Sequence, residues 1–227
     1  MGNLLLVFVK WPEPGKVKTR LAQSVGDQEA TRIYQLLVRS VVRNLTPLFA
    51  PKAVELGMKE VTCWFFFTPR SHHEQTEHWL REEASYAGWM PEKVILKPQA
   101  GASLGMRLRA GFEQGFQAGF RKIAAIGTDC VELECALIQE AWQKLSGDCD
   151  LVFGPARDGG YYLVAMNQVE SCVIFDEIPW SSASTLAVSL ARAEQAGYRV
   201  NLLEKLSDVD TIADWQRAKT MIDSGRQ

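Results

Sequence analysis

The sequence lacks three features that would each indicate a class of protein: an excess of positive charge, cysteines at metal-binding spacing and a long apolar run. Its 25 Lys and Arg residues are nearly balanced by 27 Asp and Glu residues, which argues against a general nucleic-acid binder. The five cysteines include no CxxC pair, so neither a disulfide framework nor a cysteine-rich zinc site is expected. The first apolar run, residues 4–9, is too short to cross a bilayer and follows no basic leader. We therefore expect a cytoplasmic protein without membrane insertion.

Short apolar runs of strand length alternate with amphipathic stretches of helix length. Several of the apolar runs are hydrophobic at consecutive positions, which is typical of strands that helices cover on both faces. We predict the α/β class, with a mostly parallel central sheet flanked by helices, formed by residues 1–227 as a single domain. The predicted strands are 4–9, 61–67, 93–97, 122–126, 151–153, 161–166 and 199–203, and the predicted helices are 27–45, 71–83, 103–120, 133–145, 184–196 and 211–222.

A cluster of cations follows the first predicted strand, in the segment KWPEPGKVKTRL that runs from Lys10 to Leu21. Ligands of parallel sheets bind beyond the carboxyl ends of the strands, so this loop is a candidate site for an anion such as a phosphate. It has neither the Walker A spacing nor a GxGxxG motif, and a basic, solvated turn is the alternative. The candidate phosphate-binding residues are Lys10, Gly15, Lys18, Thr19 and Arg20.

Acidic residues follow two of the later predicted strands. Asp129 comes directly after the run 122–126, where a carboxylate can hold Mg²⁺ or Mn²⁺ against a diphosphate. Asp208 and Asp210 follow the run 199–203, and either could supply a second metal ligand. For this second pair the alternative is structural, because Asp210 or Thr211 could simply cap the last helix.

A glycine turn stands between the predicted strands 151–153 and 161–166. Gly159 and Gly160 follow Asp158, and they would let the backbone approach a ligand closely before Tyr161 begins the next strand. An ordinary Asp-Gly hairpin turn is the alternative. We predict a catalytic or hydroxyl-binding role for Asp158 and substrate contacts for the two glycines and Tyr161.

These blocks, in this order, resemble an uncharacterised bacterial family of nucleotide-diphospho-sugar transferases, often described as glycosyltransferases and associated with radical-SAM, selenium or arsenosugar gene cassettes. The resemblance extends over KWPEPGKVKTRL, the Asp129 and Asp158 blocks, Trp180-Ser181 and Asp208-Val209-Asp210-Thr211. It implies a glycosyltransferase-A-type, Rossmann-like fold, similar to that of sugar nucleotidyltransferases and of the guanylyltransferases acting on molybdopterin and phospholactate. It also implies phosphate contacts from Lys18 and Arg20, a metal on Asp129 with Asp208 or Asp210, and substrate contacts from Trp180 and Ser181.

The chain departs from the family pattern at two places. Val131 stands where the family commonly has proline, which alters a turn but leaves Asp129 in position. The family's middle motif resembles Gly-Asp-Leu-Gly-Glu-Arg-Met, whereas residues 102–108 read ASLGMRL, so that Ser103 and Met106 replace both acidic residues. If either carboxylate reads a substrate in relatives, specificity has shifted here or activity is impaired.

Three functions are consistent with these residues. The first is a metal-dependent glycosyltransferase that moves a sugar from a nucleotide sugar to a small-molecule acceptor. The second is a nucleotidyltransferase that couples a nucleoside triphosphate to a phosphorylated small molecule, which the four cations of residues 10–20 favour by their charge. The third is a non-catalytic nucleotide-binding protein, suggested by the altered segment 102–108. The oligomeric state is open, a homodimer included.

Overall fold

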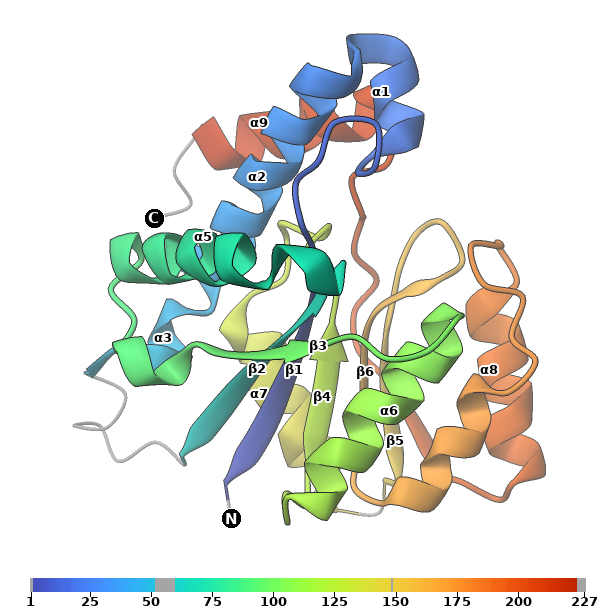
Figure 1. Cartoon of the computed structure of the whole chain (residues 1–227). Helices are drawn as coiled ribbons and strands as arrows, with labels where there is room; N and C mark the ends of the chain where they lie inside the picture. The colour runs from blue at the N-terminus through green and yellow to red at the C-terminus, as the bar shows by residue number, and fades with distance from the viewer. Residues whose placement is uncertain (1, 52–59, 148, 224–227) are drawn as a thin grey trace.

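The chain folds around a seven-stranded sheet with the strand order β3-β2-β1-β4-β6-β5-β7 (Figure 1). The computed structural model describes residues 2–51, 60–147 and 149–223. All seven predicted strands are present, and the central ones are runs of residues buried on both faces of the sheet, whereas β3 and β7 at the two edges are only partly buried. The strands are β1 (Asn3–Lys10), β2 (Val61–Thr68), β3 (Ile95–Pro98), β4 (Ile123–Ile126), β5 (Leu151–Pro155), β6 (Tyr161–Met166) and β7 (Val200–Leu202).

Among the strands of the described residues, β6 alone runs against its neighbours. It pairs antiparallel with both β4 and β5, and it returns from β5 through a tight turn in which Ala156 N donates to the Gly160 carbonyl. The Asp-Gly hairpin turn is therefore present. The sheet is mostly parallel, as predicted, and the carboxyl ends of its parallel strands share one edge.

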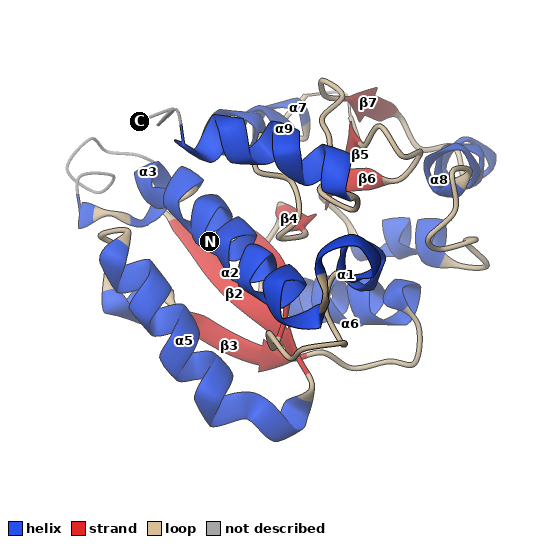
Figure 2. Cartoon of the chain, turned by 90° about the horizontal axis from the view of Figure 1, so that it is seen from above, coloured by secondary structure: helices blue, strands red, loops and turns tan. Residues whose placement is uncertain are grey.

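Helices cover both faces of the sheet (Figure 2). Along β1, Leu5, Val7 and Val9 pack into one buried cluster with α2, α5 and α7, while Leu4 and Leu6 pack into another with α6, α8 and the 3-10 helix η3. Strand side chains alternate between the two faces, and both faces are apolar here because both are buried. The bounds are α2 (Asp27–Asn44), α5 (His73–Tyr86), α6 (Leu104–Gln117), α7 (Cys135–Lys144), η3 (Val169–Phe175) and α8 (Thr185–Gln195).

A third apolar cluster brings the first and last helices together at the carboxyl-end edge of the sheet (Figure 1). It contains Leu21 of α1 (Thr19–Val25), Ile33 and Leu37 of α2, and Trp215 of α9 (Ile212–Asp223), with Val209 from the segment before α9. This packing holds the loop after β1 beside the segment after β7. The remaining short helices are α3 (Thr46–Phe49), η1 (Arg70–His72) and η2 (Pro91–Lys93). None of the helices in the described ranges is both long and apolar enough to cross a bilayer.

Candidate functional site

A cavity of about 800 Å³ opens at the carboxyl ends of β1 and β4. It is lined by segments that are far apart in the chain, namely the loop after β1, the residues after β4, the β5–β6 turn, the loop before α8 and the segment before α9. The cavity therefore gathers most of the predicted site residues. Those that line it are Lys10, Lys18, Thr19, Arg20, Asp129, Asp158, Gly160, Tyr161, Trp180, Ser181, Asp208 and Asp210.

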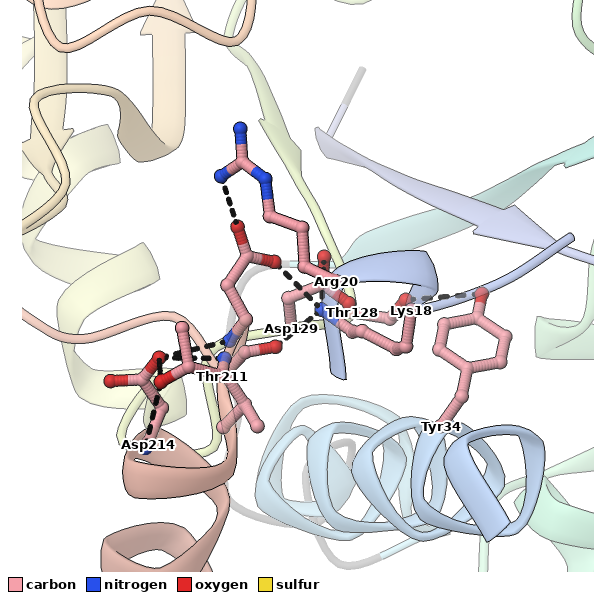
Figure 3. Close-up of polar contacts among 9 residues, drawn as sticks. Lys18, Arg20, Tyr34, Thr128, Asp129, Thr211 and Asp214 are labelled. Carbon is pink, nitrogen blue, oxygen red and sulfur yellow. Dashed lines mark hydrogen bonds and ion pairs between the residues drawn. The ribbon is translucent and has the colours of Figure 1, made fainter. Parts of the chain in front are cut away.

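Lys18 lines this cavity, and its ammonium lies against acidic residues (Figure 3). Its Nζ is 2.9 Å from Asp129 Oδ2 and 3.5 Å from Asp210 Oδ1, and it donates to the Val209 carbonyl at 2.6 Å. The side chain is only 5 % exposed. The resemblance implied that Lys18 faces a phosphate, but in the structure its ammonium is bound to two carboxylates and a carbonyl.

Arg20 extends from the first turn of α1 toward the mouth of the cavity. Its Nη1 lies 3.3 Å from Asp210 Oδ2, and its side chain is 64 % exposed, so most of the guanidinium faces solvent. Lys10 donates from Nζ to the Lys16 carbonyl at 2.5 Å and thereby holds the loop closed. Arg20 is therefore far more open to a ligand than Lys18.

Asp208 is the most perturbed acid of the site. Burial, and after it the nearby Asp129, Asp158 and Asp210 carboxylates, raise its pKa to about 7, although Lys18 lowers it. Burial and neighbouring carboxylates both disfavour the charged form of a carboxyl group. The cluster therefore has the oxygen donors that suit Mg²⁺ or Mn²⁺.

Metal binding depends on how the carboxylates are arranged as well as on their chemistry. Within the described residues, no three His, Cys, Asp or Glu side chains stand in an arrangement that could hold a metal ion. The sequence predicted a metal on Asp129 with Asp208 or Asp210, but the Lys18 ammonium binds Asp129 and Asp210 in this structure. Metal binding at these carboxylates stays a prediction.

The segment that presents Asp210 is fixed by the start of α9. Thr211 Oγ1 accepts a hydrogen bond from Asp214 N, and the Asp214 carboxylate accepts from Thr211 N, Thr211 Oγ1 and Asp210 N. This reciprocal arrangement is a capping box, in which Thr211 rather than Asp210 caps the helix. The carboxylate of Asp210 is thereby left to the cavity.

Tyr34 and Thr128 belong to the site, but no pattern in the sequence predicts a role for them there. Tyr34 reaches from α2, where its hydroxyl accepts from Lys10 N at 2.9 Å and from Thr128 Oγ1 at 3.4 Å, so it joins the ends of β1 and β4 (Figure 3). Burial and the Asp129 carboxylate raise the pKa of the phenol, so it stays protonated. In the sequence, Tyr34 is indistinguishable from the other core residues of an amphipathic helix.

The glycine turn touches the cavity through one glycine and packs against protein through the other. Gly160 lines the cavity, and its N–H donates to Asp158 Oδ1 at 2.8 Å. Gly159 has a φ of +92°, lies against the backbone of Ala183 and is outside the set of described residues that line the cavity, so its substrate contact stays a prediction. Gly15, with a φ of +74°, shapes the first loop and lies outside the set of described residues that line the cavity.

The two positions of segment 102–108 that lack the family's acidic residues lie outside the cavity lining. Ser103 is the N-cap of α6, and its hydroxyl accepts from Met106 N, a role that aspartate fills equally well. Of the described residues in this segment, Leu104, Arg107 and Leu108 line the cavity, but neither Ser103 nor Met106 does. The non-catalytic alternative stays a prediction.

A profile of the family described as "Uncharacterized protein conserved in bacteria (DUF2064)" matches residues 56–182, which is more than half of the chain. The chain belongs to this family. The broad class predicted from the sequence is confirmed, while the association with particular gene cassettes stays a prediction. No curated protein matches the sequence.

Solved structures of transferases share the fold of this DUF2064 protein. A protein from Desulfovibrio desulfuricans G20, provisionally named a nucleotide-diphospho-sugar transferase, is 28 % identical with a TM-score of 0.80, over 100 % of this chain and 90 % of its own. A CMP:2-keto-3-deoxy-manno-octonic acid synthetase in complex with CTP is 10 % identical with a TM-score of 0.56, over 99 % of both chains. The 4-diphosphocytidyl-2C-methyl-D-erythritol synthase of Anaerococcus prevotii is 9 % identical with a TM-score of 0.58, over 98 % of both chains.

Proposed function

We propose that the protein is a metal-dependent glycosyltransferase that moves a sugar from a nucleotide-sugar donor to a small-molecule acceptor. The observation that carries this proposal is the convergence, in one cavity, of Lys18 and Arg20 with Asp129 and Asp210, which lie more than 100 residues away in the chain. A fold shared with nucleotide-dependent transferases supports the same conclusion. We also propose that the protein acts inside the cell and uses a nucleotide sugar as its donor there.

Charge alone does not separate a nucleotide sugar from a triphosphate. Five cationic and four acidic side chains line the cavity among the described residues, which leaves a formal surplus of one positive charge. A nucleotide sugar carries about two negative charges and a triphosphate about four. With one divalent cation, the total charge would be about +1 for the nucleotide sugar and about −1 for the triphosphate, so neither ligand is better neutralised. The loop cations alone favour a triphosphate, but the acids that pair with them cancel that preference, and the proposal of sugar transfer follows the likeness to the provisionally named nucleotide-diphospho-sugar transferase.

In this proposal, the acidic residues of the cavity and Arg20 have separate roles. Asp129, with Asp208 or Asp210, would hold Mg²⁺ or Mn²⁺, which when bound neutralises charge on the leaving nucleoside diphosphate. Arg20 binds the phosphates from the cavity mouth, where its guanidinium is exposed. Asp158 accepts a hydrogen bond from a sugar or acceptor hydroxyl through the carboxylate oxygen that Gly160 does not use.

A second candidate is nucleotidyl transfer, because the structural neighbours include a protein named a cytidylyltransferase and one provisionally named a glucose-1-phosphate thymidylyltransferase. Product analysis separates the two. The protein is incubated with a panel of nucleotide sugars and nucleoside triphosphates, Mn²⁺ and candidate acceptors, and products are resolved by ion-exchange chromatography. Release of a nucleoside diphosphate from a nucleotide sugar is the expected result. Pyrophosphate released from a triphosphate would instead establish the second candidate, and nucleotide binding without either product would reject both.

A further inference from the structure

The Lys18 ammonium is surrounded by three oxygens of the protein, through one hydrogen bond and two ion pairs. An ammonium has three N–H donors and no acceptor. Three oxygens surround Lys18 Nζ, from Asp129 at 2.9 Å, Asp210 at 3.5 Å and the Val209 carbonyl at 2.6 Å. Lys18 therefore acts as the cation of the carboxylate cluster in this structure.

The backbone holds Lys18 in this place. Its φ of 47° and ψ of 44° lie in the left-handed region, which costs a residue other than glycine about 1 kcal/mol or more. Such a conformation persists where the surrounding contacts impose it. The contacts here are the ion pairs with Asp129 and Asp210, which tie the loop after β1 to the segments after β4 and β7 (Figure 3).

Lys18 is much more buried than the two carboxylates that it contacts. The Lys18 side chain is 5 % exposed, whereas Asp129 is 42 % and Asp210 is 40 % exposed. The carboxylates thus lie on the solvent side of the ammonium, which contacts them from within the protein. A cation that enters from the cavity meets carboxylates whose Oδ2 (Asp129) and Oδ1 (Asp210) already bind Lys18.

We propose that the Lys18 ammonium is a built-in competitor of the divalent cation, so that the carboxylate cluster binds Mg²⁺ or Mn²⁺ well only together with nucleotide phosphates. This inference rests on the proposed nucleotide-dependent function. A free metal ion must displace a cation that is covalently part of the site. Phosphate oxygens supply the metal with further ligands and give Lys18 a new anionic partner. Metal and nucleotide consequently increase each other's affinity by the same factor.

The test is a titration of the purified protein with Mn²⁺ alone, with free Mn²⁺ measured by electron paramagnetic resonance. Lys18→Gln removes the competing charge but keeps a donor for the Val209 carbonyl, and we expect Mn²⁺ to bind it roughly tenfold more tightly than the wild type. Lys144→Gln removes an equal charge from a partly exposed pair with Glu140 on α7, away from the residues that line the cavity, and it should leave the affinity unchanged. Equal Mn²⁺ affinity for the wild type and Lys18→Gln would overturn the inference.

The wild-type protein gives a second, independent measurement if Lys18→Gln does not fold. Water-proton relaxation distinguishes protein-bound Mn²⁺ from the small Mn²⁺–pyrophosphate complex. Inorganic pyrophosphate should raise the affinity of the wild type for Mn²⁺ roughly tenfold, and no increase would contradict the competition. These Mn²⁺-binding measurements test the inference separately from the proposed function. Tighter Mn²⁺ binding by Lys18→Gln without any turnover would reject the function and keep the inference, and turnover with unchanged Mn²⁺ binding would do the reverse.

Discussion

The loop before α8, which contains Ala183 and lines the cavity, packs against Gly159. The variant Gly159→Ala tests whether this packing fixes the position of the loop. A Cβ at residue 159 would lie 2.6 Å from the carbonyl carbon of Ala183, whereas ordinary contact begins near 3.4 Å, so one of the two segments must move by about 1 Å. The change also forces an alanine to a φ of +92°, at about 1–2 kcal/mol, and strains the hydrogen bond from Leu186 N to the Gly159 carbonyl, worth about 1 kcal/mol. We expect the free energy of unfolding to fall by about 2–3 kcal/mol.

Gly197→Ala is the matched control for this variant. Gly197 has a φ of +76°, but an added Cβ would meet nothing within 4 Å, so this variant bears the backbone cost of about 1 kcal/mol alone. Urea denaturation measures both losses, and product formation measures function. Because Ala183 is near Trp180 and Ser181 of the cavity wall, Gly159→Ala should reduce turnover more than tenfold. Equal stability losses in the two variants, with full turnover in Gly159→Ala, would refute the reasoning.

Three further predictions concern single side chains. Arg20→Gln should weaken nucleotide binding, measured by calorimetry, roughly tenfold, because its exposed guanidinium is available to phosphates. Ser103→Ala should lower the free energy of unfolding in urea by about 1 kcal/mol, through loss of the α6 cap, and leave nucleotide affinity unchanged. The folded-state pKa of Asp208, about 7, lies above its ordinary value, so the folded state binds the extra proton and loses stability as pH rises toward 7. In metal-free buffer the melting temperature should therefore fall more steeply between pH 5 and pH 8 for the wild type than for Asp208→Asn.

The elements of the fold were predictable because the sheet is buried on both faces. Runs such as 4–9 and 61–67 are apolar at consecutive positions, and each is a strand within one or two residues of the predicted bounds. The direction of β6 was harder to predict, since an Asp-Gly turn between two apolar runs is equally consistent with a ligand loop. The bounds of the short helix α1 are not predictable from the sequence, because its seven residues are too few to show a period.

The site was predictable in position but only partly in the contacts of its residues. Residues that follow parallel strands meet at one edge, so Arg20, Asp129 and Asp210 were expected together. Which cation pairs with which acid depends on side-chain reach and backbone conformation, as the left-handed Lys18 shows. The role of Tyr34 depends on tertiary packing between α2 and the ends of β1 and β4, which no local pattern records.

The central claim is that nucleotides bind at Asp129 beside the loop after β1. Calorimetric titration with a panel of nucleoside diphosphates, with and without Mn²⁺, tests it on the wild type, Asp129→Asn and the control Asp223→Asn, which alters an exposed carboxylate at the end of α9. We predict that the wild type and Asp223→Asn bind at least one nucleotide in a Mn²⁺-dependent manner and that Asp129→Asn does not. Unchanged affinity and metal dependence in Asp129→Asn would contradict the claim.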